Sequence, residues 1–435
     1  MHPRRSAAWL IVGVVVAAGC TAGSTTSTTD TVTTVPAAST SAAGTTTTTP
    51  AGEHRVTVEG GYGSGVYPPG ATVHVWSAAS TTGDVVQRWS GDAALLAEPD
   101  EWRTSFVMPA RDVALVANST SLSIEPIVET FTGLTSVAKT VRYVLPANLR
   151  GVVLFNHGTG GSGAFLESTE AFPLALALVA DGYGVVSIDA EEAVAGDLNG
   201  DGKQRWVARA TADNVDLGNL QLLFDSLEAR GSIPAGTPKL ALGMSAGGNF
   251  SHLLGTLAAT PAAAAFPQLR FVAVVSFCAD ATASRSASLS TTPSAWYMCA
   301  AEDNPEVSNA EARANEARLR GRGVATDYAE HGASPLYDER FTRIEGIDAV
   351  TSAAIAAELR AAGFVDEAGF ITLDGDEIAA VVAAEPTSFP TIMSIRQGAA
   401  IRSQIKVMRA EHSMFADLTR RTIEFFDRFN PTPAP

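Results

Sequence analysis

A serine framed by glycines is the first feature of the sequence that could do chemistry. Residues 243–247 read GMSAG, a G-x-S-x-G pattern that follows the apolar run KLAL and precedes a run compatible with a helix. A sharp strand-to-helix turn would lift the hydroxyl of Ser245 out of a sheet, and the glycines leave room for that backbone. A free serine hydroxyl is a weak nucleophile and needs a base within reach. The pattern predicts nucleophilic catalysis, with a buried turn of small residues as the alternative.

A parallel sheet is expected to position this serine. Apolar runs alternate with helix-like segments over the last three hundred residues, and the runs are GVVLFNHG, GYGVVSIDA, KLALGMS, FVAVVSFCAD, SAWYMCAAED and QIKVMRAEH. Buried strands separated by helices indicate an α/β fold with a mostly parallel sheet covered on both faces. Functional residues should then gather at the carboxyl ends of the strands.

The loop HGTGG at residues 157–161, after the first of these strands, resembles the oxyanion loop of the α/β-hydrolase superfamily. With the G-x-S-x-G turn, the resemblance implies the doubly wound α/β-hydrolase sheet. It also implies that the backbone N–H of Ala246 and a second one, from Thr159 or Gly160, stabilise the oxyanion of a tetrahedral intermediate. His157 precedes the nucleophile, whereas the superfamily order is serine, acid, histidine, so we expect His157 to shape the loop.

Three carboxylates are candidates for the acid of a triad. Asp303 in SAWYMCAAEDN resembles the superfamily's G-x-x-D after a late strand, with Ala300 in place of the glycine. That departure leaves Glu302 open as an alternative. Asp280, after VVSFC, is the third candidate, because some lipases of the superfamily take their acid from that earlier strand.

Two histidines compete for the role of the base, which in this superfamily leaves the last strand and precedes the final helix. His412 follows the strand-like QIKVMRA and precedes FADLTRRTIEFFDRF, whose apolar residues have helical spacing. His331 follows VATDYAE and precedes GASPLYDERF, which holds a proline, so we expect it in a surface loop. We assign His412 as the base, with His331 as runner-up, and give His252 no catalytic role.

A triad of Ser245, Asp303 and His412 implies hydrolysis of carboxylic esters, small or polymeric, through an acyl-enzyme intermediate. The acyl transfer itself requires no cofactor. A serine peptidase of the same fold would carry the same residues, and a non-catalytic surface adhesion protein is the second alternative. Net charge is −16 with 46 acidic and 30 basic residues, which argues against a nucleic-acid partner.

An insertion is expected between the acid and the base. We predict a catalytic domain over residues 121–331 and 401–431, and a cap over 332–400 that shapes the acyl pocket or forms a docking subdomain. Two amphipathic helices are predicted in it, DAVTSAAIAAELRAAG and DGDEIAAVVAAE. The segment FPTIMSI is close in sequence to His412 and contributes the apolar residues Phe389, Ile392, Met393 and Ile395.

The first 52 residues are expected to be a leader and a tether. Residues 1–19 have two arginines before a short apolar run, which is typical of an export signal. The ending AAGC resembles a bacterial lipobox with Cys20 as the lipidated residue, so the protein is expected to be exported, either as a membrane-anchored lipoprotein or as a secreted protein. Residues 20–52 are rich in Ser and Thr and predict a disordered tether.

Short alternating runs over residues 53–120 predict a small antiparallel β module. The phrases GSGVYPPGATVHV, WSGD and FVMPARDVAL resemble the divergent B-repeat modules of bacterial surface proteins. The resemblance implies a spacer, or a surface that contacts glycans or polymers through Trp76, Trp89 and Trp102. At least some of these indoles are expected in the core of so small a domain.

Cys278 and Cys299 follow two of the apolar runs. In an exported protein this pair could form a disulfide, and two buried thiols are the equal alternative.

The segment DLNGDGKQRW, residues 197–206, begins like a calcium loop. Asp197, Asn199 and Asp201 could supply side-chain oxygens, and the carbonyl of Lys203 a fourth ligand. Ala208 occupies the position of the bidentate glutamate, so an EF-hand is excluded. The alternatives are a structural Ca²⁺ site completed by Glu191, Glu192 or Asp213, and a polar turn whose side chains bond their own backbone.

Overall fold

The computed structural model describes residues 52–79, 83–281 and 290–430, which belong to one compact unit, Thr49–Pro435. The predicted export signal, Cys20 and nearly all of the predicted tether lie outside the described residues. Within the described ranges, no helix has both the length and the apolarity that crossing a bilayer requires.

The β module consists of two small sheets. One has the strand order β3-β1-β7-β5 and the other β2-β4-β6. The elements are β1 (His54–Glu59), β2 (Gly61–Tyr62), β3 (Gly65–Tyr67), β4 (Thr72–Ser77), β5 (Asp84–Gly91), the short helix η1 (Ala93–Leu95), β6 (Arg103–Val107) and β7 (Val113–Ser121). The expectation of a β module is confirmed. Its purely antiparallel character was wrong, because β1 and β7 pair in parallel; these two strands are far apart in the chain, so no hairpin fixes their direction.

The three tryptophans of the module are buried, which corrects the idea of a glycan platform. Trp89 lies in the core of the module, and its indole N–H donates to the Glu101 carbonyl oxygen at 2.9 Å. Trp76 and Trp102 pack against residues outside the module, among them Tyr337 and Ala416. All three side chains are at most 4 % exposed, so none can stack on a ligand in solution.

The main sheet has eight strands in the order β15-β14-β13-β12-β10-β11-β9-β8, and only β9 runs against the others. Its strands are β8 (Ile127–Thr132), β9 (Ala138–Val144), β10 (Gly151–Asn156), β11 (Tyr183–Ile188), β12 (Lys239–Met244), β13 (Phe271–Phe277), β14 (Ser294–Cys299) and β15 (Thr326–His331). This mixed α/β architecture with a mostly parallel sheet is the α/β-hydrolase fold, as the sequence predicted. Five of the six predicted strands are confirmed as β10 to β14.

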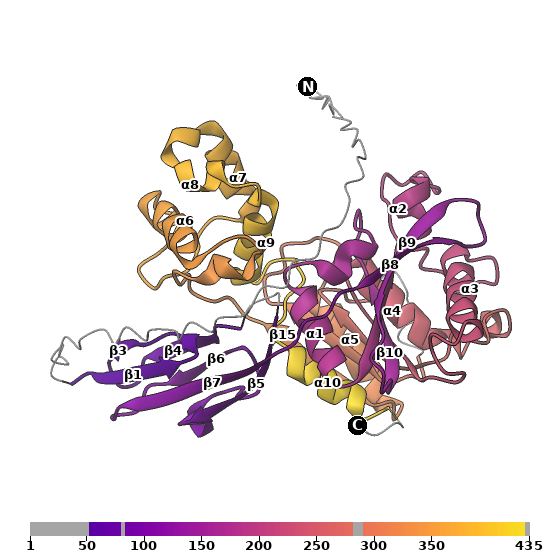
Figure 1. Cartoon of the computed structure of the whole chain (residues 1–435), viewed down its shortest axis with the longest axis horizontal. Helices are drawn as coiled ribbons and strands as arrows, with labels where there is room; N and C mark the ends of the chain where they lie inside the picture. Colours follow the sequence, from indigo (N-terminus) through magenta and orange to yellow (C-terminus); the bar gives the residue numbers. More distant parts are fainter. Residues whose placement is uncertain (1–51, 80–82, 282–289, 431–435) are drawn as a thin grey trace, which may run out of the picture. The chain divides into compact units, whose positions relative to one another are not determined.

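Helices cover both faces of the main sheet because successive strand residues point to opposite sides. In β10, Val153 and Phe155 pack in one core with α1 (Ala171–Ala180) and α10 (Thr419–Asp427). Val152 and Leu154 pack in a second core with α3 (Val215–Ala229) and α4 (Ala246–Leu257), on the other face (Figure 1). The remaining elements of this part are η2 (Gly163–Glu167), α2 (Glu191–Ala195), η3 (Pro261–Ala264) and α5 (Asn309–Gly321).

The insertion forms a helical subdomain with its own core. Its elements are η5 (Arg340–Arg343), α6 (Ala349–Ala361), α7 (Gly375–Ala384), η6 (Pro386–Ser388), α8 (Pro390–Ser394) and α9 (Gly398–Met408). The two predicted amphipathic helices are confirmed as α6 and α7. Phe389 and Ile392 lie in the core of the subdomain, so they do not line the wall of a pocket at His412.

The last predicted strand was wrong. QIKVMRA belongs to helix α9, and Ile401, Ile405 and Met408 join the core of the insertion. Ile and Val favour strands, but apolar residues at spacings of four and three form one side of a helix. The insertion therefore extends to Met408, eight residues beyond the predicted boundary.

The eighth strand of the sheet is β15, which the sequence did not reveal. It carries Asp327 and Glu330 and is only partly buried at the sheet edge. Asp327 is matched by Arg421 of α10, which donates to both carboxylate oxygens at 2.7 and 2.8 Å. A charged edge strand lacks the continuous apolar run by which buried parallel strands are recognised.

Candidate active site

Ser245 lies on a tight turn between β12 and α4. Its backbone has φ +56° and ψ −122°, and its N–H donates to the carbonyl oxygen of Phe277 in β13 at 2.9 Å. A Cβ on Gly243 would lie 2.4 Å from the Gly247 backbone, and one on Gly247 would lie 2.0 Å from the oxygen of Asn156. Both glycines are thus required by the close approach of the turn to the end of β10.

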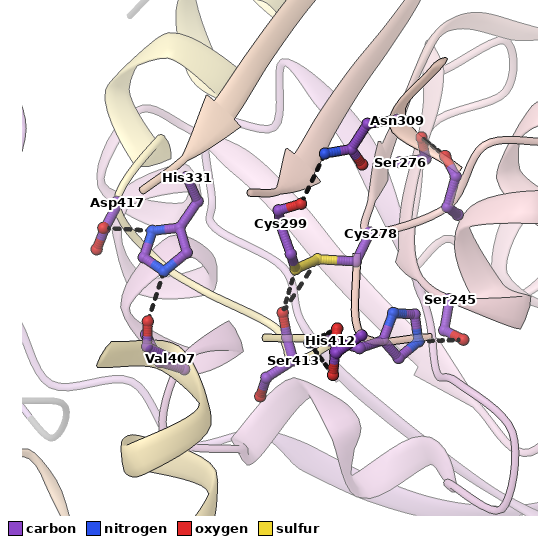
Figure 2. The surroundings of a disulfide bond; sticks show 12 residues. Ser245, Ser276, Cys278, Cys299, Asn309, His331, Val407, His412, Ser413 and Asp417 are labelled. Atoms are coloured by element: carbon purple, nitrogen blue, oxygen red, sulfur yellow. Dashed lines mark hydrogen bonds and ion pairs between the residues drawn. A yellow bond between two sulfur atoms is a disulfide. The ribbon is translucent and has the colours of Figure 1, made fainter. Parts of the chain in front are cut away.

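His412 reaches this serine from a loop near the end of the chain. Its Nε2 lies 2.9 Å from the Ser245 hydroxyl oxygen (Figure 2). The side chain is partly buried, and burial lowers the pKa of His412, while the nearby Asp303 carboxylate opposes that shift. A neutral imidazole at this distance can accept the serine proton.

Asp303 is brought to His412, but to its backbone. The two carboxylate oxygens accept the His412 N–H at 3.0 and 3.2 Å. The loop after β14 is further joined to the turn before His412, because the Ala301 N–H donates to the Ala410 oxygen at 3.0 Å. No described residue forms a hydrogen bond to Nδ1 of His412. The carboxylate therefore holds the loop of the histidine and attracts a positive charge on its ring.

The two other candidate acids accept hydrogen bonds from backbone N–H groups at the start of a helix instead. Glu302 accepts from the N–H of Asn309 at 3.0 Å, and Asp280 accepts from the N–H of Ser308 at 2.8 Å. Both N–H groups belong to the start of α5, where backbone donors lack partners within the helix.

The competing histidine, His331, is not in a surface loop as expected. It ends β15 with 2 % exposure, its Nε2 donates to the Val407 oxygen at 2.7 Å, and its Nδ1 lies 2.6 Å from an Asp417 carboxylate oxygen. Its ring stacks on Phe415 with centroids 4.4 Å apart. The surface-loop prediction failed because the edge strand before His331 was not recognised.

His157 and His252 are buried. Nε2 of His157 accepts the Ala190 N–H at 3.0 Å, so Nδ1 carries the proton and donates to the Gly158 oxygen at 2.8 Å. The expectation that His157 shapes the loop is confirmed. His252 contacts the Ser276 hydroxyl at 2.9 Å and stacks on Trp296, and burial lowers its pKa to about 3.

The loop after β10 lies beside the serine. A Cβ on Gly158 would be 3.5 Å from Cβ of Ser245. The N–H of Gly160 donates to the Gln204 oxygen at 2.8 Å, so this N–H is already engaged. Thr159 is exposed, and Ala246 is the first residue of α4, where an N–H has no acceptor in a preceding helical turn. Of the three backbone N–H groups predicted to stabilise an oxyanion, those of Thr159 and Ala246 therefore remain as candidates.

A cavity of about 490 Å³ opens next to Ala246. Its lining includes Asn249 of α4 and residues of the 198–209 loop, namely Leu198, Asn199, Asp201, Arg205, Trp206, Val207, Ala208 and Arg209, together with Glu192. This wall was not predicted, because the oxygen-bearing residues of the same loop have the spacing of a calcium site. The apolar residues Trp206, Val207 and Ala208, which follow the polar part of the loop, are the signal that could have indicated a pocket wall.

The oxygens of the proposed calcium loop are used by the loop itself. Asp197 accepts the N–H groups of Gly200 and Gly202 at 2.8 and 2.7 Å, and Asn199 accepts that of Asp201 at 2.9 Å. Asp201 forms an ion pair with Arg205. Of the residues offered to complete the shell, Glu191 pairs with Lys139 at 2.6 Å, whereas Glu192 accepts from Asn199. In the part of the chain that is described, no three His, Cys, Asp or Glu side chains gather as a metal site.

Cys278 and Cys299 form a disulfide that joins the carboxyl ends of β13 and β14. Of the two alternatives left open by the sequence, the structure contains the bridge. Both sulfurs contact the carbonyl oxygen of Ser413, at 3.4 and 3.6 Å, directly after His412 (Figure 2). The bridge therefore lies against the loop that carries the histidine.

Comparison with protein-family models and with curated proteins found no match. Solved structures that resemble the chain include a dienelactone hydrolase from Anabaena variabilis, with 20 % identity, 54 % of this chain and 95 % of that chain covered, and a TM-score of 0.35. A Bacillus cereus carboxylesterase has 16 % identity, 44 % and 83 % coverage, and a TM-score of 0.30. Thermogutta terrifontis esterase 2 has 15 % identity, 55 % and 95 % coverage, and a TM-score of 0.36. Since these TM-scores are below 0.5, the fold assignment rests on the strand order of this chain.

Proposed function

We propose that the protein is a serine hydrolase that cleaves carboxylic esters through an acyl-enzyme intermediate. The observation that carries the proposal is the 2.9 Å contact between His412 Nε2 and the Ser245 hydroxyl, on a positive-φ turn after the central strand β12. A serine in an ordinary buried turn needs neither that backbone nor a histidine at its hydroxyl.

In this mechanism His412 takes the proton of Ser245 as its oxygen attacks the ester carbonyl. The charge that develops on the carbonyl oxygen is stabilised by the N–H groups of Ala246 and Thr159. His412 then donates the proton to the leaving alcohol, and a water molecule activated in the same way releases the acid. Asp303 stabilises the imidazolium by its charge and anchors the histidine loop through the His412 N–H.

The test combines a probe for the nucleophile with a set of substrates. A fluorophosphonate should label wild-type protein at Ser245, and p-nitrophenyl esters of increasing chain length should be hydrolysed. Ser245→Ala should abolish both, whereas Ser394→Ala, a serine on the exposed surface of α8, should change neither. Absence of labelling in folded wild-type protein would contradict the enzyme proposal and favour an adhesion protein. Faster cleavage of peptide p-nitroanilides than of esters would favour a peptidase.

We further propose that the protein is exported and anchored through Cys20. The disulfide between Cys278 and Cys299 supports export, because such bonds persist in oxidising compartments. Incorporation of a labelled fatty acid into the wild type, and its loss in Cys20→Ser, is the expected result. If the mature protein carries no labelled fatty acid, the lipid anchor is excluded and secretion without a lipid remains.

A further inference from the structure

The segment that carries the proposed base, residues 411–421, is held at two ends. At its near end Asp303 binds the His412 N–H, and the disulfide sulfurs lie against the Ser413 oxygen. At its far end the contacts come from another part of the chain, the β module. These are Arg103 to Asp417, and Glu101 to the first turn of α10.

Arg103 joins the module to three places at once. Its Nη1 donates to an Asp417 carboxylate oxygen at 2.6 Å and to the Gly332 oxygen at 3.0 Å, and its Nη2 donates to the Ala333 oxygen at 2.9 Å. Side-chain exposure is 12 % for Arg103 and 10 % for Asp417. Burial raises the pKa of Asp417, but His331 and Arg103 outweigh it and hold that pKa well below its usual range. Charge-assisted bonds in such surroundings are strong and directional.

Glu101 supplies the cap that α10 lacks. One carboxylate oxygen accepts the N–H of Arg420 at 3.2 Å and the other accepts that of Arg421 at 3.0 Å. These are the second and third residues of the helix, and the residue before its first turn is Leu418, whose side chain cannot accept a hydrogen bond. Burial raises the pKa of Glu101 well above its usual range and the two N–H groups only oppose that shift, so the cap acts through hydrogen bonds to the carboxyl oxygens. The helix that follows His412 is thus capped from the β module.

Aromatic packing closes the same interface. Trp76 stacks on Tyr337 with centroids 4.2 Å apart, and the Arg343 guanidinium lies 3.9 Å above the ring of Trp102. Arg343 also contacts the buried Glu170, which accepts the Ala416 N–H at 3.0 Å. A spacer that merely displayed the enzyme would not need buried charges shared with the base segment.

We infer that the β module is a positioning element of the active site. Arg103 and Glu101 fix the far end of the base segment and so keep His412 Nε2 at the Ser245 hydroxyl. The inference rests on the proposed function. Without these contacts the far end keeps its bonds within the catalytic part, from Ala416 to Glu170, Asp417 to His331 and Arg421 to Asp327. It is then held less firmly, and His412 samples positions in which the proton transfer distance is lost. A displacement of about 1 Å can cost roughly a hundredfold in rate.

The experiment uses the full chain with Arg103→Ala and Glu101→Gln. Arg111→Ala is the matched arginine control, because Arg111 pairs with Asp92 inside the module, and Glu59→Gln, on the exposed end of β1, is the acidic control. Rates of ester hydrolysis are normalised to the folded fraction measured by thermal melting. We expect kcat to fall roughly ten- to a hundredfold in the two test variants, with KM within about twofold, and no change in the controls.

Two further readouts separate positioning from stability. The ring NMR signals of ¹⁵N-labelled His412, identified by their loss in His412→Ala, should move in Arg103→Ala and stay in Arg111→Ala. Arg103→Lys should recover part of kcat, since an ammonium can still bind Asp417 but cannot reach both carbonyl oxygens.

The outcomes are distinguishable. If wild-type protein is not labelled by a fluorophosphonate, the proposed function itself fails. If the wild type is labelled, and Arg103→Ala and Glu101→Gln retain wild-type kcat and His412 signals, the positioning inference is overturned. If one test variant does not fold, the other, with Arg103→Lys, decides by the same criteria.

Discussion

Two histidines at the carboxyl edge of the main sheet lie in opposite surroundings. The ring of His331 is buried, with an acceptor at each nitrogen, the Val407 oxygen and the Asp417 carboxylate. The ring of His412 is partly exposed, and within the described residues its one hydrogen bond is to the Ser245 hydroxyl. Both ring nitrogens of His331 are engaged with these acceptors, so neither is directed at a hydroxyl whose proton it could take. A histidine beside a carboxylate can thus act as a base only if one of its nitrogens remains available.

The largest effect is expected for His412→Ala, which removes the proton acceptor. We expect kcat for ester hydrolysis to fall by about 10⁴-fold or more. The free energy of unfolding should change by less than about 1 kcal/mol, since the ring is only partly buried. Stopped assays and urea unfolding measure the two quantities, with His54→Ala in β1 as control. Full activity in His412→Ala together with its loss in His331→Ala would reverse the comparison.

Asp303→Asn tests the carboxylate that accompanies His412. We expect a decrease in kcat of about a hundredfold, because the amide keeps its size but loses the charge that stabilises the imidazolium. Glu302→Gln and Asp280→Asn, which alter carboxylates at the start of α5, should retain kcat within a few-fold. A larger loss in either of these two than in Asp303→Asn would assign the acid elsewhere.

His331→Ala should act on stability rather than on proton transfer. Removing the imidazole takes one hydrogen-bond partner from the buried Asp417, which keeps Arg103, and this costs about 1–3 kcal/mol. Urea unfolding should show this decrease, and His54→Ala, which alters a partly exposed side chain of β1, should show a much smaller one. A wild-type unfolding free energy in His331→Ala would indicate that its contacts are dispensable.

The pH profile gives a smaller, graded test of the same base. Burial lowers the pKa of His412 below 6.5, and the neutral form is the active one, so kcat/KM should rise with pH through a pKa below 6.5 and level off above it. Asp303 opposes this shift, so Asp303→Asn should move the acid limb to still lower pH. An acid limb with a pKa above 6.5 would show that burial does not control the pKa of His412.

The smallest effect is expected at the 197–206 loop. Its carboxylate and amide oxygens already accept backbone N–H groups. A thermal melt in EDTA and one in millimolar CaCl₂ should therefore coincide. A bound ion would instead raise the melting temperature by mass action, and Asp201→Ala would remove that increase.

Local constraints explain what the sequence predicted well. The serine turn needs a fixed backbone and two residues without Cβ, so it has a short pattern, and the buried strands β10 to β14 have continuous apolar runs. The edge strand β15 was not predicted because it lacks such a run, and the helix α9 was predicted as a strand because its apolar residues pack against neighbours that are distant in the chain. Ile405 and Val407 favour a strand locally, yet they pack in a helix against distant residues.

Long-range contacts explain what the sequence could not predict. Glu101 and Arg103 lie in a stretch whose spacing indicates only a β module, and Asp417 is one acidic residue in a C-terminal run. Their roles depend on contacts between parts of the fold that are distant in the chain, and no local sequence pattern predicts such contacts. The gathering of Asp303 at the His412 backbone, rather than at its ring, likewise depends on the course of two loops.

The separation between Arg103 and Asp417, 314 positions along the chain, has a consequence for biosynthesis. Translation proceeds from the N-terminus, so the β module and the serine turn are made before the insertion, and His412 emerges among the last residues of the fold. A nascent chain that has completed β12 carries Ser245 without its base or the cap on α10. Contacts this distant also slow folding, because a long loop must close before they form. If the proposed mechanism holds, the hydroxyl of Ser245 has no proton acceptor until the C-terminal segment has reached it.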